Sequence, residues 1–120
     1  MGTALVVEDS LTEREIITQY LKQAGITVAI ATSGEEALEK LLGDLPDLIV
    51  LDVVLPGRSG FEICRELKAE ARTSKIPVII CSTKNTDMDK FWGKRQGADA
   101  YIPKPIDQDI FLSTIKQLIL

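Results

Sequence analysis

Acidic residues end two short apolar segments of this chain. Glu8 and Asp9 follow residues 3–7 (TALVV), and Asp52 follows residues 48–51 (LIVL). A carboxylate at the edge of an apolar segment is costly to desolvate, so it needs a partner or a use for its charge. Carboxylates that lie close together repel one another and are neutralised well by a hard cation, and Mg²⁺ prefers oxygen ligands. If the fold brings these three acids together, we expect them to bind Mg²⁺.

A hydroxyl and a lysine follow two later apolar segments. Ser82 comes directly after residues 77–81 (PVIIC), and Lys104 comes two residues after 100–102 (AYI). A metal ion and a lysine can neutralise the oxygens of a phosphoryl group while a carboxylate attacks it in line. The chain has no histidine, which excludes histidine bases and Ser–His or Cys–His nucleophile pairs. These residue types therefore point to phosphoryl transfer, with Asp52 as the nucleophile.

The pattern of the whole chain predicts five strands that alternate with five helices. Near-continuous apolar segments rich in β-branched residues favour strands covered on both faces. The predicted strands are 3–7, 27–31, 48–51, 77–81 and 100–102, and the predicted helices are 11–23, 34–42 and three that begin near 61, 87 and 108. The alternation predicts an α/β fold, a flavodoxin-like (βα)5 three-layer sandwich whose parallel sheet has the order 2-1-3-4-5.

This strand order also predicts where a site forms. In such a sheet a site lies outside the carboxyl ends of the strands, between the first and third strands, where the order reverses. Glu8 and Asp9 follow the first of these strands and Asp52 follows the third. We therefore expect the three acids to converge on one crevice.

Helix ends and burial follow from local patterns. Ser10 with Glu13, and Ser33 with Glu36, form capping-box patterns, and Asp107 is the expected cap of the last helix. The residues expected to be buried in the second helix are Ala37, Leu38, Leu41 and Leu42. Phe91 and Trp92 are expected to be divided between the core and a partner surface, and Cys64 and Cys81 to be small buried hydrophobic residues.

Composition narrows the class of protein. The chain has 120 residues, with 14 Lys and Arg against 18 Asp and Glu and a formal net charge of -4. One domain, 1–120, is expected at this length, and the negative charge argues against nonspecific binding to nucleic acid. No apolar segment is long enough to insert into a membrane, and two scattered cysteines suit a reducing compartment. We therefore expect a cytoplasmic protein.

Four motifs carry a resemblance that covers essentially the whole chain. The segments VVEDS, LDVVLPGRSG, ICST and YIPKP each lie at the end of a predicted strand. In this order and spacing they resemble the receiver domains (CheY-like) of bacterial two-component response regulators. The predicted fifth helix ends the sequence, so the expectation is a receiver domain with no output domain.

The resemblance implies a role for each site residue. It implies that Asp52 accepts a phosphoryl group from a histidine kinase, and that the protein is a phosphoacceptor with self-catalysed phosphotransfer and autodephosphorylation rather than an enzyme. The Mg²⁺ ligands would be Glu8, Asp9, Asp52 and the backbone carbonyl of Val54; Ser82 and Tyr101 would be the switch residues, and Lys104 would pair with the phosphoryl group. Tyr101 also has a sufficient structural explanation, because an aromatic residue can pack an edge strand. Family members commonly have a cis bond at the position of Lys104–Pro105.

The resemblance extends to partners and pathway. Residues 83–105 resemble single-domain regulators of chemotaxis-like systems that control twitching motility and phototaxis through type IV pili. The implied partners are a CheA-like histidine kinase, or its phosphotransfer domain, and an effector. The effector would bind the face built from the fourth helix, the fifth strand and the fifth helix. Val54 and Lys84 offer no polar group that would orient an attacking water, which suggests a slow to intermediate phosphoryl lifetime.

Three other functions compete with this interpretation. A phosphatase that turns over through an aspartyl phosphate would usually carry a second Asp at the position of Val54. A flavodoxin would need a loop that cradles phosphate where Glu8 and Asp9 would repel it. A phosphorylation-independent docking module with a receiver fold is the third, although it would be expected to lack part of the acidic site.

Overall fold

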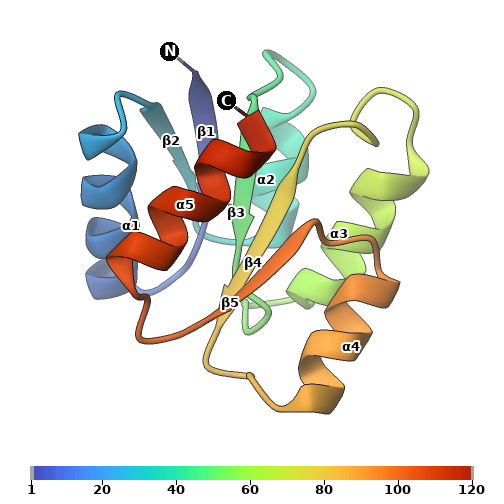
Figure 1. Ribbon diagram of the computed structural model, residues 1–120. Coiled ribbons are helices and arrows are strands. Elements are labelled where there is room, and N and C mark those ends of the chain that lie inside the picture. The colour runs from blue at the N-terminus through green and yellow to red at the C-terminus, as the bar shows by residue number, and fades with distance from the viewer. Residues whose placement is uncertain (1, 120) are drawn as a thin grey trace.

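The computed structural model describes residues 2–119 and contains five strands alternating with five helices (Figure 1). The strands are β1 (Thr3–Val7), β2 (Thr27–Ala31), β3 (Leu48–Leu51), β4 (Val78–Ser82) and β5 (Ala100–Pro103). The helices are α1 (Leu11–Gln23), α2 (Gly34–Lys40), α3 (Gly60–Ala69), α4 (Asp87–Arg95) and α5 (Gln108–Ile119). None of these helices is long and apolar enough to cross a bilayer.

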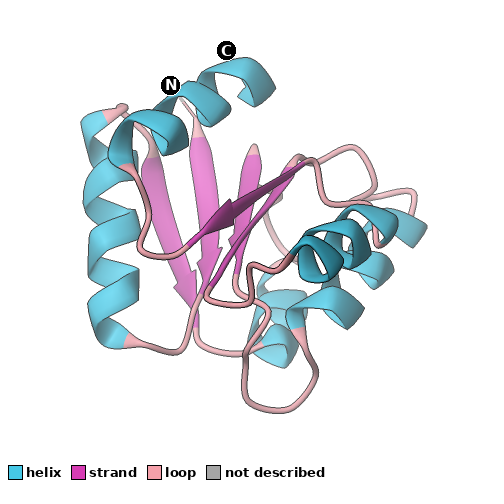
Figure 2. Ribbon diagram, turned by 60° about the horizontal axis from the view of Figure 1, so that its bottom comes forward, coloured by secondary structure: helices cyan, strands magenta, loops and turns pink. Residues whose placement is uncertain are grey.

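All five strands are parallel and have the order β2-β1-β3-β4-β5. Helices cover both faces of this sheet (Figure 2). Residues of α1 and α5 pack in one apolar cluster with one face of the sheet, whereas residues of α2 and α3 pack in a second cluster with the other face. The predicted flavodoxin-like (βα)5 sandwich and its order 2-1-3-4-5 are therefore confirmed.

Strands β1, β3 and β4 form the buried centre of the sheet, but β2 does not. Four of the five residues of β1 and all residues of β3 and β4 are buried, which is why these segments are almost continuously apolar. In β2, Thr27 and Ala29 are exposed. The prediction that β2 is covered on both faces was wrong, because it lies at the edge of the sheet.

Two further differences concern helix packing. α2 ends at Lys40, and Leu42 lies beyond it with 79% of its surface exposed, so its predicted burial was wrong. Phe91 and Trp92 are both exposed, at 58% and 48%, rather than divided between core and surface. The buried residue of α4 is Gly93, which packs so closely against the Tyr101 ring that an added Cβ would lie 2.7 Å from it. Phe91 and Trp92 lie on the exposed surface of the helix.

Each of the first four helices begins with a hydroxyl cap. The side chains of Ser10, Ser33, Ser59 and Thr86 accept the N–H of the residue three positions later. At α5 the Asp107 carboxylate accepts the N–H of Ile110 at 3.0 Å, which confirms the expected cap. The Lys104–Pro105 peptide bond is cis, as the resemblance implied.

Candidate functional site

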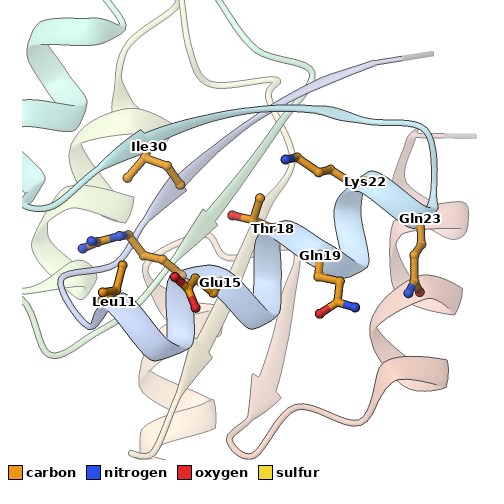
Figure 3. Close-up of a pocket in the computed structure, with 8 residues that line it drawn as sticks. Leu11, Glu15, Thr18, Gln19, Lys22, Gln23 and Ile30 are labelled. Carbon is orange, nitrogen blue, oxygen red and sulfur yellow. The ribbon is translucent and has the colours of Figure 1, made fainter.

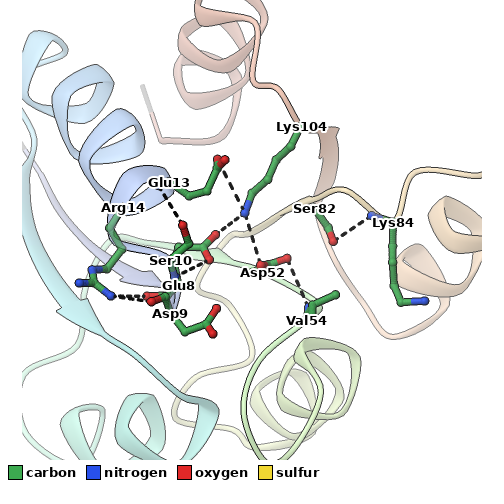
Figure 4. Close-up of polar contacts among 10 residues, drawn as sticks. All are labelled: Glu8, Asp9, Ser10, Glu13, Arg14, Asp52, Val54, Ser82, Lys84 and Lys104. Carbon is green, nitrogen blue, oxygen red and sulfur yellow. Dashed lines mark hydrogen bonds and ion pairs between the residues drawn. The ribbon is translucent and has the colours of Figure 1, made fainter.

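The three predicted acids meet at the carboxyl ends of β1 and β3. Val7 and Leu51 are register partners, so the residues that follow them emerge side by side. Glu8, Asp9 and Asp52 each place a carboxylate oxygen within 4.8 Å of the others (Figure 4). Glu8 and Asp52 are buried and Asp9 is exposed. The crevice predicted from the strand order is therefore present.

Lys104, which follows β5, brings a positive charge into this acidic cluster. Its ammonium contacts Glu8 Oε1 and lies 3.3 Å from Asp52 Oδ2 and 3.9 Å from Glu13 Oε2. The Lys104 side chain is only 5% exposed, so its ion pairs with the buried Glu8 and Asp52 are largely removed from water. A residue distant in sequence thus completes the site, as predicted.

Opposing effects set the pKa values of the buried pair. Burial disfavours charge on Lys104, but the hydrogen bond that its ammonium donates to Glu8 and the nearby negative charge of Asp52 outweigh it, and the pKa of Lys104 is raised. The pKa of Glu8 is raised because burial, reinforced by the charge of Asp52, outweighs the stabilising hydrogen bond from Lys104. The lysine is therefore firmly cationic.

The donor set fits a divalent metal ion. The three carboxylates and the single Lys104 ammonium leave two negative charges uncompensated. All the available ligands are oxygens, as Mg²⁺ prefers. Asp9 forms no ion pair within residues 2–119, so its carboxylate is available as a ligand. The acidic pocket therefore has the charge and chemistry of a Mg²⁺ site.

Backbone groups orient Asp52. The N–H of Val54 donates to Asp52 Oδ1 at 3.3 Å, and the backbone N–H of Asp52 donates to the carbonyl of Val7 at 3.1 Å. Gly60 lies against the same segment, where an added Cβ would lie 1.9 Å from the Asp52 carbonyl oxygen. The close start of α3 therefore requires glycine beside the site.

The two predicted switch residues hold one peptide segment between them. The hydroxyl of the fully buried Ser82 accepts the N–H of Lys84 at 3.2 Å, and the Tyr101 hydroxyl donates to the carbonyl of Lys84. Burial, with the negative charges of Asp89 and Asp52, raises the pKa of Tyr101 to about 12. Ser82 and Tyr101 are thus connected through Lys84, at the loop that leads into α4.

Sequence reasoning missed two residues of the site. Glu13 is the third carboxylate near Lys104, and Arg14 Nη1 donates to the backbone carbonyls of Glu8 and Asp9 at 3.2 and 3.1 Å. Both lie in the first turn of α1, directly after the acidic pair. Their position in that turn is the available signal, but the sequence pattern identifies Glu13 only as part of a helix cap.

A separate hollow of about 670 Å³ runs along α1 toward β2 (Figure 3). Its lining includes Leu11, Thr18, Lys22 and Ile30, and it includes none of the three acids of the site. Arg14, which holds the backbone of Glu8 and Asp9, also lines the hollow, so the hollow adjoins the site but contains none of its acids.

Comparison with known proteins gives a consistent result. The family model described as "Response regulator receiver domain" matches residues 4–116. The chain is 41% identical to Protein PilH of Pseudomonas aeruginosa over 119 residues, which are 99% of this chain and 98% of PilH. The receiver domain of a signal transduction histidine kinase from Syntrophus aciditrophicus has a TM-score of 0.92 at 34% identity, covering 99% of this chain and 90% of that one. Chemotaxis protein CheY4 of Vibrio cholerae has a TM-score of 0.90 at 30% identity, covering 98% of each chain.

Proposed function

Because this chain belongs to the response regulator receiver family and so acts in a two-component phosphorelay, we propose that Asp52 is its phosphoacceptor. The observation that carries the proposal is the position of Asp52. Its carboxylate lies 3.3 Å from the Lys104 ammonium and within 4.8 Å of carboxylate oxygens of Glu8 and Asp9. Glu8 contacts Lys104 directly and is almost fully buried, whereas Asp9 is exposed.

Each residue of the site would have a separate role in phosphoryl transfer. An Asp52 oxygen forms a bond to phosphorus while the bond from phosphorus to the kinase imidazole nitrogen breaks, and that nitrogen retains the electron pair. The Val54 N–H orients the attacking carboxylate, and Lys104 compensates the charge of the phosphoryl oxygens. Glu8, Asp9, Asp52 and the Val54 carbonyl would hold Mg²⁺. When bound, the metal supplies further positive charge to the phosphoryl oxygens.

Phosphorylation of Asp52 would be transmitted through Ser82 and Tyr101. A phosphoryl oxygen would accept the Ser82 O–H, and movement of the hydroxyl toward it would weaken the hydrogen bond that Ser82 Oγ accepts from the Lys84 N–H. Tyr101 holds the other side of the same peptide segment, and its ring packs beside Gly93 of α4. A change at Ser82 would therefore alter the segment leading into α4 and the face formed by α4, β5 and α5.

Acetyl phosphate provides the direct test of the phosphoacceptor. The wild-type protein with Mg²⁺ should gain the mass of one phosphoryl group, and the Asp52→Asn variant should gain none. Asp44→Asn, which changes an exposed acid outside the site, is the matched control and should behave as wild type. Omission of Mg²⁺ should slow the reaction strongly. No gain in the wild-type protein would reject the proposal and favour a phosphorylation-independent docking module.

We also propose that the signalling is chemotaxis-like and controls type IV pili, with a CheA-like kinase upstream and an effector bound at α4. The support is the similarity to PilH and CheY4, together with the resemblance of residues 83–105 to twitching-motility regulators. α4 presents Met88, Phe91 and Trp92 to solvent on one stripe, since they occur at positions i, i+3 and i+4. An apolar stripe of this kind suits a protein partner.

Complementation tests the pathway and the surface together. Expression of the wild-type chain in Pseudomonas aeruginosa lacking PilH should restore the motility of the parent strain, and Asp52→Asn should not. Trp92→Ala should also fail, although it should be phosphorylated by acetyl phosphate as fast as wild type. Full restoration by Asp52→Asn would instead support docking without phosphorylation.

A further inference from the structure

The helix cap at the start of α1 is incomplete, and this frees the Glu13 carboxylate. Ser10 Oγ accepts the Glu13 N–H at 3.4 Å, but the Ser10 N–H donates to Glu8 Oε2 at 3.2 Å. In a complete capping box the third-position acid would accept that N–H. Because the Ser10 N–H already donates to Glu8, the Glu13 carboxylate does not accept it.

α4 shows what the complete arrangement looks like in this chain. The Asp89 carboxylate accepts the N–H of Thr86 at 3.1 Å, while Thr86 Oγ1 accepts the N–H of Asp89 at 3.1 Å. Both acids lie at the third position of their helices. The Asp89 carboxylate caps its own helix, whereas the Glu13 carboxylate lies beside Lys104.

Glu13 is the outermost of the three carboxylates around Lys104. Its Oε2 lies 3.9 Å from the ammonium, and its side chain is 32% exposed, whereas the Glu8 and Asp52 side chains are 2% and 9% exposed. The carboxylate points from α1 toward the ammonium (Figure 4). Glu13 thus attracts Lys104 toward α1, although it is neither the proposed acceptor nor one of the two acids that follow β1.

We propose that Glu13 is a positioning residue that holds Lys104 toward α1 and thereby opposes the phosphorylated state. This inference rests on the proposed role of Asp52. A phosphoryl group adds between one and two negative charges, which attract Lys104 and repel Glu13. Glu13 is therefore attracted to Lys104 in the resting site and is repelled more strongly by the occupied one, and such a difference shifts the equilibrium toward rest.

The size of the effect is limited by solvent. Because Glu13 is about one-third exposed, its interaction with Lys104 is screened and corresponds to an equilibrium change of about threefold. High salt should reduce that change, since exposed charges are screened within a short distance. The salt dependence distinguishes an electrostatic role from a packing role.

Beryllium fluoride with Mg²⁺, a stable mimic of the phosphoryl group, gives an equilibrium measurement. Bound fluoride is followed by ¹⁹F NMR during titration of the full chain. Glu13→Gln should bind the mimic about threefold more tightly than wild type, and the difference should shrink in high salt. Glu15→Gln removes the same charge from an exposed position of α1 and should bind as wild type does. Glu13→Asp, whose shorter side chain withdraws the charge, should bind with intermediate affinity.

The outcomes separate this inference from the function on which it rests. Equal or weaker binding by Glu13→Gln, with normal binding by wild type, would overturn the role of Glu13 and leave Asp52 as the acceptor. An equal gain in Glu13→Gln and Glu15→Gln would also overturn it, because net charge alone would explain the result. If the wild-type protein neither binds the mimic nor reacts with acetyl phosphate, the proposed function is rejected, and this inference with it.

Discussion

Asp9 differs from the other acids of the site because it is exposed and has no ion pair among the described residues. Its charge therefore repels Glu8 and Asp52 without compensation from Lys104. We expect Asp9→Asn to raise the free energy of unfolding by about 1 kcal/mol in EDTA, since one like charge is removed. The same variant should lose most of the stabilisation that Mg²⁺ gives to wild type.

Urea unfolding with EDTA and with Mg²⁺ measures both effects of this substitution. Asp44→Asn is the control, because it removes an exposed acid distant from the cluster. If Asp9→Asn were destabilised in EDTA, or were stabilised by Mg²⁺ as much as wild type, Asp9 would not be an uncompensated metal ligand.

Tyr101 should make the fold sensitive to alkaline pH. Its pKa is about 12 in the folded protein, above the ordinary value near 10, so the folded state holds this proton more tightly than the unfolded state. The resulting stability is present below pH 10 and is lost as pH rises through about 12. Tyr101→Phe should be less stable at neutral pH, because it lacks the hydrogen bond to Lys84, and its stability should fall less between pH 10 and 12.

Thermal unfolding of the two proteins across this pH range provides the comparison. The difference curve isolates Tyr101 from the lysines and from Tyr20, which both proteins share. Parallel curves for wild type and Tyr101→Phe would show that the hydroxyl does not titrate differently in the folded state.

Residue types and strand ends were enough to predict most of the site. Glu8, Asp9, Asp52 and Lys104 each follow a strand, and parallel strands bring such positions to one edge. The role of Glu13 could not be predicted, because the cap pattern gave its carboxylate a sufficient local partner. Only the structure shows that this partner, the Ser10 N–H, donates to Glu8 instead.

At the scale of elements, the entry into α3 depends on a glycine. A Cβ at Gly60 would lie 1.9 Å from the carbonyl oxygen of Asp52, so backbone would have to move. Gly60→Ala should lower the free energy of unfolding by about 2 kcal/mol or more, despite the better helix propensity of alanine. It should also slow phosphorylation by acetyl phosphate, because the backbone that moves carries Asp52.

Gly43 provides the matched control for this substitution. It has no positive φ, and the nearest atom to an added Cβ is the Lys40 carbonyl oxygen at 3.6 Å. Gly43→Ala should therefore be neutral or slightly stabilising, since alanine restricts the unfolded chain. Urea midpoints and acetyl phosphate rates distinguish the two variants; equal effects would refute the close contact at Gly60.

The elements that prediction misjudged lie at the periphery. Apolar runs reveal strands but not their place in a sheet, so β2 was expected to be covered as fully as the central strands. In α4 the buried residue is Gly93 and the exposed ones are Phe91 and Trp92, the reverse of what hydrophobicity suggests. That arrangement depends on the Tyr101 ring, which no local pattern places beside Gly93.

At the scale of the whole molecule, the chain order was predictable because few topologies satisfy alternating strands and helices. Parallel strands joined by right-handed crossovers allow a small set of orders, and five strands at this length favour the one observed. The sheet then divides the core into two apolar clusters, one on each face. Every side chain of β3 and β4 belongs to one cluster or the other, apart from Ser82.

The two cysteines report on these clusters separately, because Cys64 lies in one and Cys81 in the other. Both thiols are free and buried, and burial raises the pKa of Cys64 to about 11, so neither should react with iodoacetamide in the folded protein at pH 8. Since the central strands contribute side chains to both clusters, we expect the two faces to unfold together.

Labelling of each cysteine in increasing urea, measured by peptide mass spectrometry, tests this expectation. After correction for the labelling rate in the unfolded chain, the two cysteines should give one common free energy of opening. A lower value at Cys64 than at Cys81 would contradict this, and would mean that the α2–α3 face opens while the α1–α5 face remains folded.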